Sequence, residues 1–257
     1  LLIRTLAPGR NYSIMSGTMI NVVGIVAGTV LGVLLGGRMS EHTRETVLRG
    51  LGLVTLVIGL QMTLDHTQNI LIVLGSVLLG GILGEWWNIE GRLESLGVWL
   101  ESRFNRGTGS AEDAARFIQG FVTASLVFCV GPLAILGAIQ DGLSGDYRLL
   151  AIKSMLDAFA ALAFSASMGI GVIFSAVSVL LYQGTITLLA SQAERILSEP
   201  MIAEMTATGG ILVAGIAVSS LLQIRKIRIG NFLPALLLAP LIVWGLTLLG
   251  MPVAPQF

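Results

Sequence analysis

Residues 149–190 decide the fold: LLAIKSMLDAFAALAFSASMGIGVIFSAVSVLLYQGTITLLA. Lys153 and Asp157 are the charged residues of this stretch, which is otherwise mostly apolar. A bilayer core of about 30 Å is crossed by roughly 20 helical residues, so the stretch is long enough for two crossings. We therefore interpret it as two transmembrane helices divided at Ser167-Met168-Gly169, both helical because lipid offers no partner for unpaired backbone groups.

The rest of the chain has the same apolar character. Of its 257 residues, 54% are hydrophobic and 12% are charged, whereas a soluble domain carries about 25% charged residues. Ionisable side chains are costly in hydrocarbon, which explains the depletion. The composition predicts an all-α, polytopic transmembrane helical bundle. The net charge is zero and no long basic run occurs, which argues against nucleic acid as a partner.

Eight apolar segments are long enough to be spans. They are residues 17–37, 50–65, 69–87, 116–139, 149–167, 169–190, 206–224 and 232–250.

The basic residues support this count because ten of the fifteen Lys and Arg fall in alternate loops. These ten are Arg38, Arg44, Arg49, Arg92, Arg103, Arg106, Arg116, Arg225, Lys226 and Arg228. The positive-inside rule places their loops in the cytoplasm and both termini outside. Treating 149–190 as one span would move the last basic loop outward.

One segment between the third and fourth spans is not apolar enough to cross a membrane. Residues 88–104 repeat apolar side chains every three or four positions, which predicts an amphipathic helix on the cytoplasmic membrane surface, in contact with lipids. Residues 105–113 are predicted to be a flexible link, and Ser110 with Asp113 resembles a capping box that opens the fourth span.

The chain is predicted to contain a single transmembrane domain, residues 15–257. Residues 1–14 contain no spanning run and precede Met15, so we interpret them as an upstream extension. A signal peptide is the alternative, but the apolar run that follows is too long for one.

A weak internal similarity predicts an inverted repeat of spans 1–3 and 6–8. Glu45 and Gly50 recur as Glu204 and Gly209 at the same spacing, and Asn69 and Asn231 each open the following span. Many transporters use such repeats. Chance similarity between apolar helices is the alternative.

Asp157 is the strongest functional signal. It lies near the middle of its span, where a charge must face protein, water or a cation. Lys153 stands one helical turn earlier on the same face. Two interpretations remain open: a proton or cation site for transport, and a buried structural ion pair that fixes helix packing.

Other polar or irregular positions could contribute to a binding site. Gly131-Pro132 must kink or break the fourth span, which frees backbone carbonyls. Asn21, Tyr182, Gln183 and Ser165 are polar residues inside predicted spans. The alternatives are a simple proline kink and polar contacts between helices.

Asp141 and Asp146 lie in the segment Asp141-Gly142-Leu143-Ser144-Gly145-Asp146. We interpret this segment as a tight external turn. Its two acids are candidates for an entrance that gathers cations.

The first span carries a stripe of small residues, with Gly24, Gly28, Gly32 and Gly36 at intervals of four. Such a stripe lets a second helix approach closely. The partner is either a helix of the same chain or a second copy, in a homo-oligomer.

Enzymatic function is not expected. Gly142-Leu143-Ser144-Gly145 matches the G-x-S-G around the serine of rhomboid proteases, but both histidines precede it. The G-x-G-D motif of aspartyl proteases is incomplete at Gly145-Asp146. No metal-binding H-E-x-x-H, P-loop or dinucleotide fingerprint occurs, so no metal or cofactor is predicted.

Several of these motifs together resemble one family. They are Gly17-Thr18-x-x-Asn21, Gly131-Pro132, Asp141 to Asp146, Lys153-Ser154-x-Leu156-Asp157, Gly169-x-Gly171-Val172 and Tyr182-Gln183-Gly184. The chain from Met15 onward resembles the uncharacterised bacterial inner-membrane proteins typified by YqgA and YdfK. The resemblance implies a bacterial inner-membrane location and supplies no substrate.

The sequence favours a secondary transporter or channel-like permease for a small ion or polar solute, coupled to a proton or cation at Asp157. The alternative is a non-transporting membrane scaffold, assembly factor or sensor that uses the 88–104 helix to bind a partner or lipid.

Overall fold

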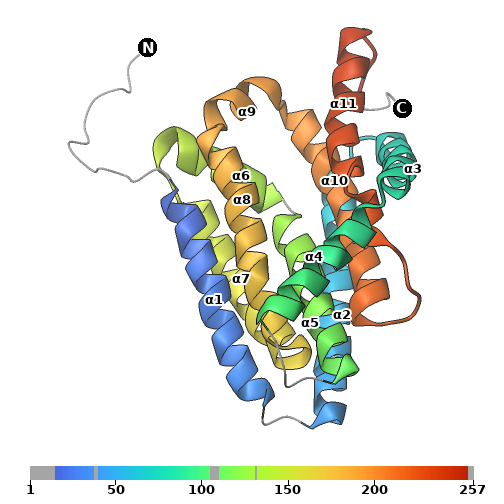
Figure 1. Cartoon of the computed structure of the whole chain (residues 1–257). Coiled ribbons are helices and arrows are strands. Elements are labelled where there is room, and N and C mark those ends of the chain that lie inside the picture. The colour runs from blue at the N-terminus through green and yellow to red at the C-terminus, as the bar shows by residue number, and fades with distance from the viewer. Residues whose placement is uncertain (1–14, 38–39, 105–109, 131, 254–257) are drawn as a thin grey trace, which may run out of the picture.

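The computed structural model describes residues 15–37, 40–104, 110–130 and 132–253, and within these ranges it contains helices and no strand (Figure 1). The all-α prediction is confirmed. The α-helices are α1 (Ser16–Gly36), α2 (Glu41–His66), α3 (Ile70–Trp87), α4 (Ile89–Phe104), α5 (Ala111–Cys129), α6 (Pro132–Ser144), α7 (Arg148–Met168), α8 (Ser175–Leu188), α9 (Ala190–Ile196), α10 (Glu199–Ile216) and α11 (Ala235–Leu248). Three short turns complete the described fold: the 3-10 turns η1 (Ile170–Phe174) and η3 (Ile229–Phe232) and the π-helical turn η2 (Ala217–Leu221).

Among the described residues, seven helical segments are long and apolar enough to cross a membrane, and a bent pair of helices could form an eighth span. The prediction of about eight spans is therefore confirmed. The segments are Ser16–Gly36, His42–His66, Ile70–Trp87, Arg148–Met168, Ile170–Leu188, Glu199–Leu221 and Ile229–Leu248, and the bent pair joins Ala111–Cys129 with Leu133–Ser144. The predicted upstream extension, residues 1–14, lies outside the described residues.

The fourth span is two helices rather than one. α5 ends at Cys129, α6 begins at Pro132, and their axes are bent by 61°. Proline has no backbone N–H to donate and fits best in the first turn of a helix, which explains why a new helix starts there. The predicted break is confirmed, while Gly131 itself lies outside the described residues.

Two helices begin earlier than the predicted spans. α2 begins at Glu41 instead of residue 50, behind Ser40, whose side chain accepts a hydrogen bond from the backbone of Thr43 at 3.3 Å. α10 begins at Glu199 instead of residue 206. Both added segments carry charged residues, which lower mean hydropathy without interrupting backbone hydrogen bonding.

The start of α5 corrects the predicted link. Ser110 and Asp113 form the predicted capping box, with Ser110 Oγ accepting from the backbone of Asp113 at 3.3 Å. Residues 110–113 therefore belong to a capped helix, and residues 105–109 of the link lie outside the described residues.

The division of the 149–190 stretch is confirmed. α7 ends at Met168, and Gly169 has φ +82°, a conformation that glycine adopts at little cost. The chain then turns through η1 into α8. A side chain at Gly171 would lie 2.0 Å from the carbonyl oxygen of Phe117, so η1 packs tightly against α5.

In Figure 1 the helices α1, α7 and α8 run side by side on one flank of the bundle, and α10 runs alongside α2 on the other. The start of α1 and the end of α11 lie at its upper end, whereas the start of α2 and the connection from η2 to η3 lie toward its lower end. This arrangement agrees with alternating loops, and their orientation in a membrane stays a prediction.

The predicted amphipathic segment is the helix α4, which runs obliquely across α5 (Figure 1). Its Gly97 is buried and faces Ile118 and Phe121 of α5. Trp99 and Phe104 are 58% and 63% exposed. The helix therefore keeps an apolar face that the described residues do not cover, as a membrane-surface helix would.

The turn η3 is tied to the junction between α3 and α4. Asn231, which is buried, accepts a hydrogen bond from the backbone N–H of Glu90 at 2.7 Å, and Glu90 Oε2 accepts from the N–H of Gly230 at 2.5 Å. Arg228 pairs with Glu85 at 2.8 Å. These contacts hold the base of α11 against the start of α4.

The residues of the internal similarity have different surroundings. Glu45 is exposed and pairs with Arg49, whereas Glu204 is fully buried. Asn69 caps α3 by accepting from the N–H of Leu71, whereas Asn231 lies within η3. The inverted repeat stays a prediction.

Candidate functional site: a buried polar cluster between α1, α7 and α8

The candidate site is centred on Asp157, near the middle of α7. The residue follows Arg148, the first residue of the helix, by nine positions, or about 13 Å at the helical rise. Asp157 is 8% exposed and Lys153 is 5% exposed. Lys153 Nζ donates to Asp157 Oδ2, so the predicted ion pair forms one turn apart on α7.

Two amide side chains from neighbouring helices join this pair. Asn21 of α1 donates from Nδ2 to Asp157 Oδ2 at 2.9 Å and to the Oε1 of Gln183, on α8, at 3.2 Å. Both amides are fully buried. The sequence singled out all four residues, and the structure brings them together. We call Asn21, Lys153, Asp157 and Gln183 the polar cluster.

The polar cluster has hydrogen-bonding capacity left over. A carboxylate only accepts, so Asn21 must turn its NH₂ toward Asp157, and its Oδ1 then has no partner among the described residues. Gln183 accepts from Asn21 through Oε1, which leaves its Nε2 likewise without a described partner. An unsatisfied buried polar group costs about 1–3 kcal/mol. One acceptor and one donor therefore remain for a further polar species.

The broken span ends beside the cluster. Cys129, the last residue of α5, is close enough to Lys153 and Asp157 to interact with them electrostatically. The break before Pro132 therefore lies at the depth of the ion pair, as expected of a span that contributes to a site. No bond from its carbonyls to the polar cluster is seen among the described residues.

Polar contacts continue from the cluster toward the upper end of the bundle. Thr18 lies one helical turn before Asn21 on α1, and Thr187 lies one turn after Gln183 on α8. Their hydroxyl oxygens are 3.4 Å apart. Asp141 Oδ2 then accepts from the backbone N–H of Gly17 at 3.0 Å. In the sequence, Thr18 stood out only as part of the motif Gly17-Thr18-x-x-Asn21 and not as a candidate site residue, because a threonine beside many apolar residues gives no distinctive signal.

Asp141 does not occupy the predicted external turn. It lies within α6, is fully buried, and binds the first turn of α1, whose N-cap residue Met15 supplies no side-chain cap. A carboxylate suits this position because a helix N-terminus carries partial positive charge. Gly142 and Gly145, which lie between Asp141 and Asp146, suggested a turn, but α6 continues to Ser144.

Asp146 does lie near the surface. Its carboxylate accepts from the backbone N–H of Arg148 at 3.1 Å and pairs with the side chain of Arg148 at 3.8 Å. This residue caps the start of α7, and its role at an entrance stays a prediction. Ser144, the residue considered for a protease, is exposed and donates to the carbonyl of Gln140.

Ser165 and Tyr182 lie away from the polar cluster. Ser165, two turns below Asp157 on α7, donates to the carbonyl oxygen of Thr29 at 3.1 Å and lines a cavity of about 260 Å³ near the lower end. Tyr182 packs against an apolar cluster that includes Ile135 and Met205, and its part in the site stays a prediction. Neighbours in sequence point to different faces of a helix, which separates Tyr182 from Gln183.

An apolar layer separates the cluster from that cavity. Ile25 stands one turn below Asn21 on α1, and Ala161 one turn below Asp157 on α7; both are fully buried. Phe128 and Phe164 pack in the same core, with ring centroids 6.0 Å apart. The cluster is therefore closed toward the lower end in this conformation.

The glycine stripe of α1 is covered by α7. A side chain at Gly28 would lie 2.2 Å from the carbonyl oxygen of Ala158, and one at Gly36 would lie 2.4 Å from that of Ala166. Gly24 and Gly32 face Ser154 and Leu162 in the same way. The close approach expected of the stripe occurs within one chain, so a homo-oligomer would have to use another surface.

A second buried acid was not recognised as a site residue. Glu204, on α10, is fully buried, and its Oε1 accepts from the backbone N–H groups of Gln68 at 2.8 Å and Asn69 at 2.7 Å. It holds the turn between α2 and α3. The sequence showed only that Glu204 lies next to a predicted span, and a loop residue can have the same position.

The comparisons with known proteins agree with this architecture. A family model described as "Protein of unknown function (DUF554)" matches residues 16–244. The uncharacterised membrane protein YdfK of Bacillus subtilis is 28% identical over 240 residues, which cover 92% of this chain and 99% of YdfK. The uncharacterised protein YqgA of Escherichia coli is 31% identical over 223 residues, or 87% of this chain and 94% of YqgA. No solved structure gives a significant match.

Proposed function

The chain belongs to the DUF554 family, and we propose that it is a secondary transporter or channel-like permease for a small ion or polar solute. The observation that carries the proposal is the polar cluster, a buried ion pair beside an acceptor and a donor that have no partner in the described part of the chain. Charged groups at this depth in a membrane protein are costly, and they commonly mark substrate or proton pathways.

The proposed coupling step is protonation of Asp157. A proton on this carboxylate removes the charge that compensates Lys153, which lies in the same buried site. Lys153 then needs a new partner, and an entering solute or a change of helix position supplies it. Proton binding and solute binding are thereby coupled through one ion pair.

The proposed path follows the contacts between α1, α7 and α8. Thr18, Thr187 and Asp141 lead from the upper end to the polar cluster, and Ser165 leads from the lower cavity. The layer of Ile25, Phe128 and Phe164 must open for passage. The break before α6 offers a position for such movement, since backbone hydrogen bonding is interrupted there.

A flux experiment tests this function. Purified protein is reconstituted in liposomes that contain a pH-sensitive dye, and small ions and polar solutes are added outside one at a time. We expect a solute to drive proton movement in the parent, and Asp157→Asn to reduce the rate about a hundredfold, which corresponds to losing roughly 3 kcal/mol of charge interaction. Ser144→Ala, at an exposed position outside the path, is the matched control. Unchanged flux in correctly folded Asp157→Asn would remove this residue from the mechanism.

We also propose that the chain resides in a bacterial inner membrane with both termini outside. The support is the concentration of basic residues in alternate loops. Introduced cysteines at Ser102 and Ser191, modified by a membrane-impermeant reagent in intact cells, test this topology. Only the cysteine at position 191 should react.

The exposed apolar face of α4 supports a second candidate, a non-transporting scaffold or sensor. Leu96, Trp99 and Phe104 are each at least 45% exposed. In this alternative, changing the three residues to serine abolishes the cellular phenotype of the protein, while Asp157→Asn affects only its stability. The transporter proposal expects the opposite result.

A further inference from the structure

Two cavities at the lower end of the bundle share the same arginines. One has a volume of about 260 Å³ and the other about 340 Å³, and Arg44, Arg116, Ser167 and Met168 line both. We call this pair of cavities the arginine pocket. The apolar layer described above separates it from the polar cluster.

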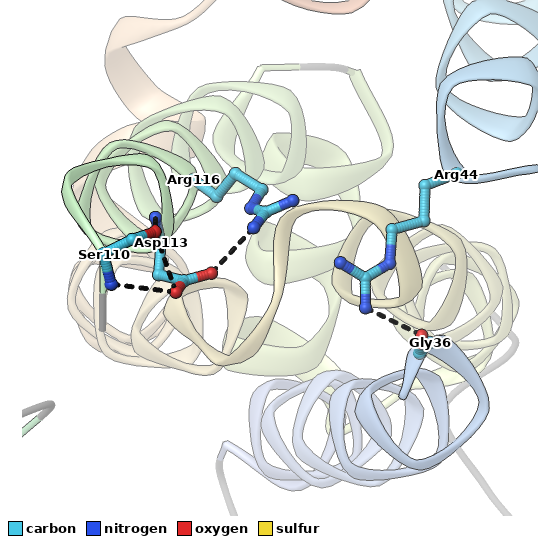
Figure 2. A network of polar contacts seen from close by, with 5 residues as sticks. All are labelled: Gly36, Arg44, Ser110, Asp113 and Arg116. Carbon is cyan, nitrogen blue, oxygen red and sulfur yellow. Dashed lines mark hydrogen bonds and ion pairs between the residues drawn. The ribbon is translucent and has the colours of Figure 1, made fainter. Parts of the chain in front are cut away.

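The two guanidinium groups reach the pocket from different helices. Arg44 lies on α2 and Arg116 on α5, and Figure 2 shows their side chains extending toward one another. Two like charges that line one space repel, and an anion between them relieves the repulsion. Ser165 and Ser167 add hydroxyl groups to the wall.

Both arginines are anchored. Arg44 Nη2 donates to the carbonyl oxygen of Gly36 at 2.8 Å, and Arg116 Nη2 donates to Asp113 Oδ1 at 2.7 Å (Figure 2). Asp113 is fixed in turn by Ser110 through the capping box. Anchoring reduces the conformational entropy that a ligand would have to remove on binding.

The charges of the described side chains that line the pocket favour an anion. Three of these residues are arginines (Arg44, Arg49 and Arg116) and two are acids (Glu45 and Asp113), so positive charge exceeds negative by one. Guanidinium groups are planar and match the geometry of carboxylate and phosphate oxygens.

We propose that the arginine pocket, through Arg44 and Arg116, binds an oxyanion, either a free phosphate or carboxylate compound or the phosphate of an anionic lipid headgroup. This proposal does not depend on transport. A site for free anions and one for lipid would share the same two guanidinium groups, and the experiment below separates them.

The first arm measures thermal unfolding in detergent while sodium phosphate replaces sodium chloride at constant ionic strength. A ligand that binds the folded state raises the unfolding midpoint. We expect phosphate to raise the midpoint of the parent and of Arg225→Gln, an exposed arginine outside the pocket. Arg44→Gln and Arg116→Gln should need at least tenfold more phosphate for the same rise.

The second arm compares nanodiscs of phosphatidylcholine with nanodiscs that contain phosphatidylglycerol, without phosphate in the buffer. A headgroup site predicts that phosphatidylglycerol stabilises the parent and Arg225→Gln but not the two pocket variants. A site for free anions predicts a response in the first arm only. Arg44→Lys keeps the positive charge at position 44. If Arg44→Gln does not fold, Arg44→Lys replaces it in both arms, beside Arg116→Gln. The proposal is overturned if neither arm distinguishes the pocket variants from Arg225→Gln.

Discussion

Asp157 and Glu204 are both buried acids of spanning helices, but their partners differ in kind. Asp157 is held by two side chains, Lys153 and Asn21. Glu204 is held by the backbone N–H groups of Gln68 and Asn69. Side chains can change rotamer and protonation state, whereas backbone groups of a turn stay in place. Burial alone therefore does not indicate function, because the two acids differ in how far the groups that compensate them can move.

The largest expected effect comes from leaving one charge of the polar cluster alone. Lys153→Met leaves the Asp157 carboxylate buried without its cation, and should lower the free energy of unfolding by about 3–5 kcal/mol. Combining it with Asp157→Leu should recover most of that loss. Chemical unfolding in detergent measures both values. Equal losses in the single and double variants would show that the pair does not act as a buried ion pair.

Substitutions of Glu204 separate the need for an acceptor from the need for a charge. Glu204→Ala leaves two backbone N–H groups unpaired and should cost about 1–3 kcal/mol, whereas Glu204→Gln retains an accepting oxygen and should cost less than half of that. Neither should change the flux per folded molecule. A flux loss in Glu204→Gln similar to that of Asp157→Asn would mean that both acids take part in transport.

Helix packing should behave alike in the two regions. Gly28→Ala would place a methyl group 2.2 Å from the Ala158 carbonyl oxygen between α1 and α7, and Gly59→Ala would place one 2.5 Å from the Ala214 backbone nitrogen between α2 and α10. Each should cost about 1–3 kcal/mol through overpacking. Gly245→Ala is the control, because among the described residues no atom beyond its own stretch of helix lies within 4 Å of the added methyl group. A neutral result at Gly28 with a cost at Gly59 would show that α7 can move away from α1.

The smallest effect concerns Glu90, an acid outside the spans that accepts a hydrogen bond from the backbone N–H of Gly230. Partial burial raises the pKa of its carboxyl group above the ordinary 4.5, although the bond from Gly230 opposes the shift. The folded state therefore binds the proton more tightly, so stability is fully present below pH 4.5 and declines as pH rises through the raised pKa. Between pH 4.5 and 7 the parent should lose stability relative to Glu90→Gln. Parallel pH profiles of thermal unfolding would contradict this assignment.

The sequence was sufficient for the elements that depend on local pattern. Hydropathy located the spans, the Ser110–Asp113 spacing located a helix start, and Pro132 located the break. The Lys153–Asp157 pair follows from helical periodicity alone, because residues four apart share a face. These features need no knowledge of which helices are neighbours.

The rest depended on tertiary neighbours. Asn21 and Gln183 are polar residues of mostly apolar helices, and only packing of α1, α7 and α8 makes them partners. Asp141 and Glu204 had the sequence surroundings of loop residues, but each compensates backbone N–H groups of a distant segment. Tyr182 and Gln183 are adjacent in sequence, but Tyr182 packs against an apolar cluster, because neighbouring residues point to different faces of a helix.

The bond from Asp141 to Gly17 has a mechanical consequence. It fastens the upper end of α1 to α6, the half of the broken span that lies beyond the 61° bend. A swing of α6 about that joint would therefore pull the first helix along with it, and Asn21, five residues after Ser16 in α1, would be displaced relative to its carboxylate partner. Through this single carboxylate, a movement of one helix would displace another.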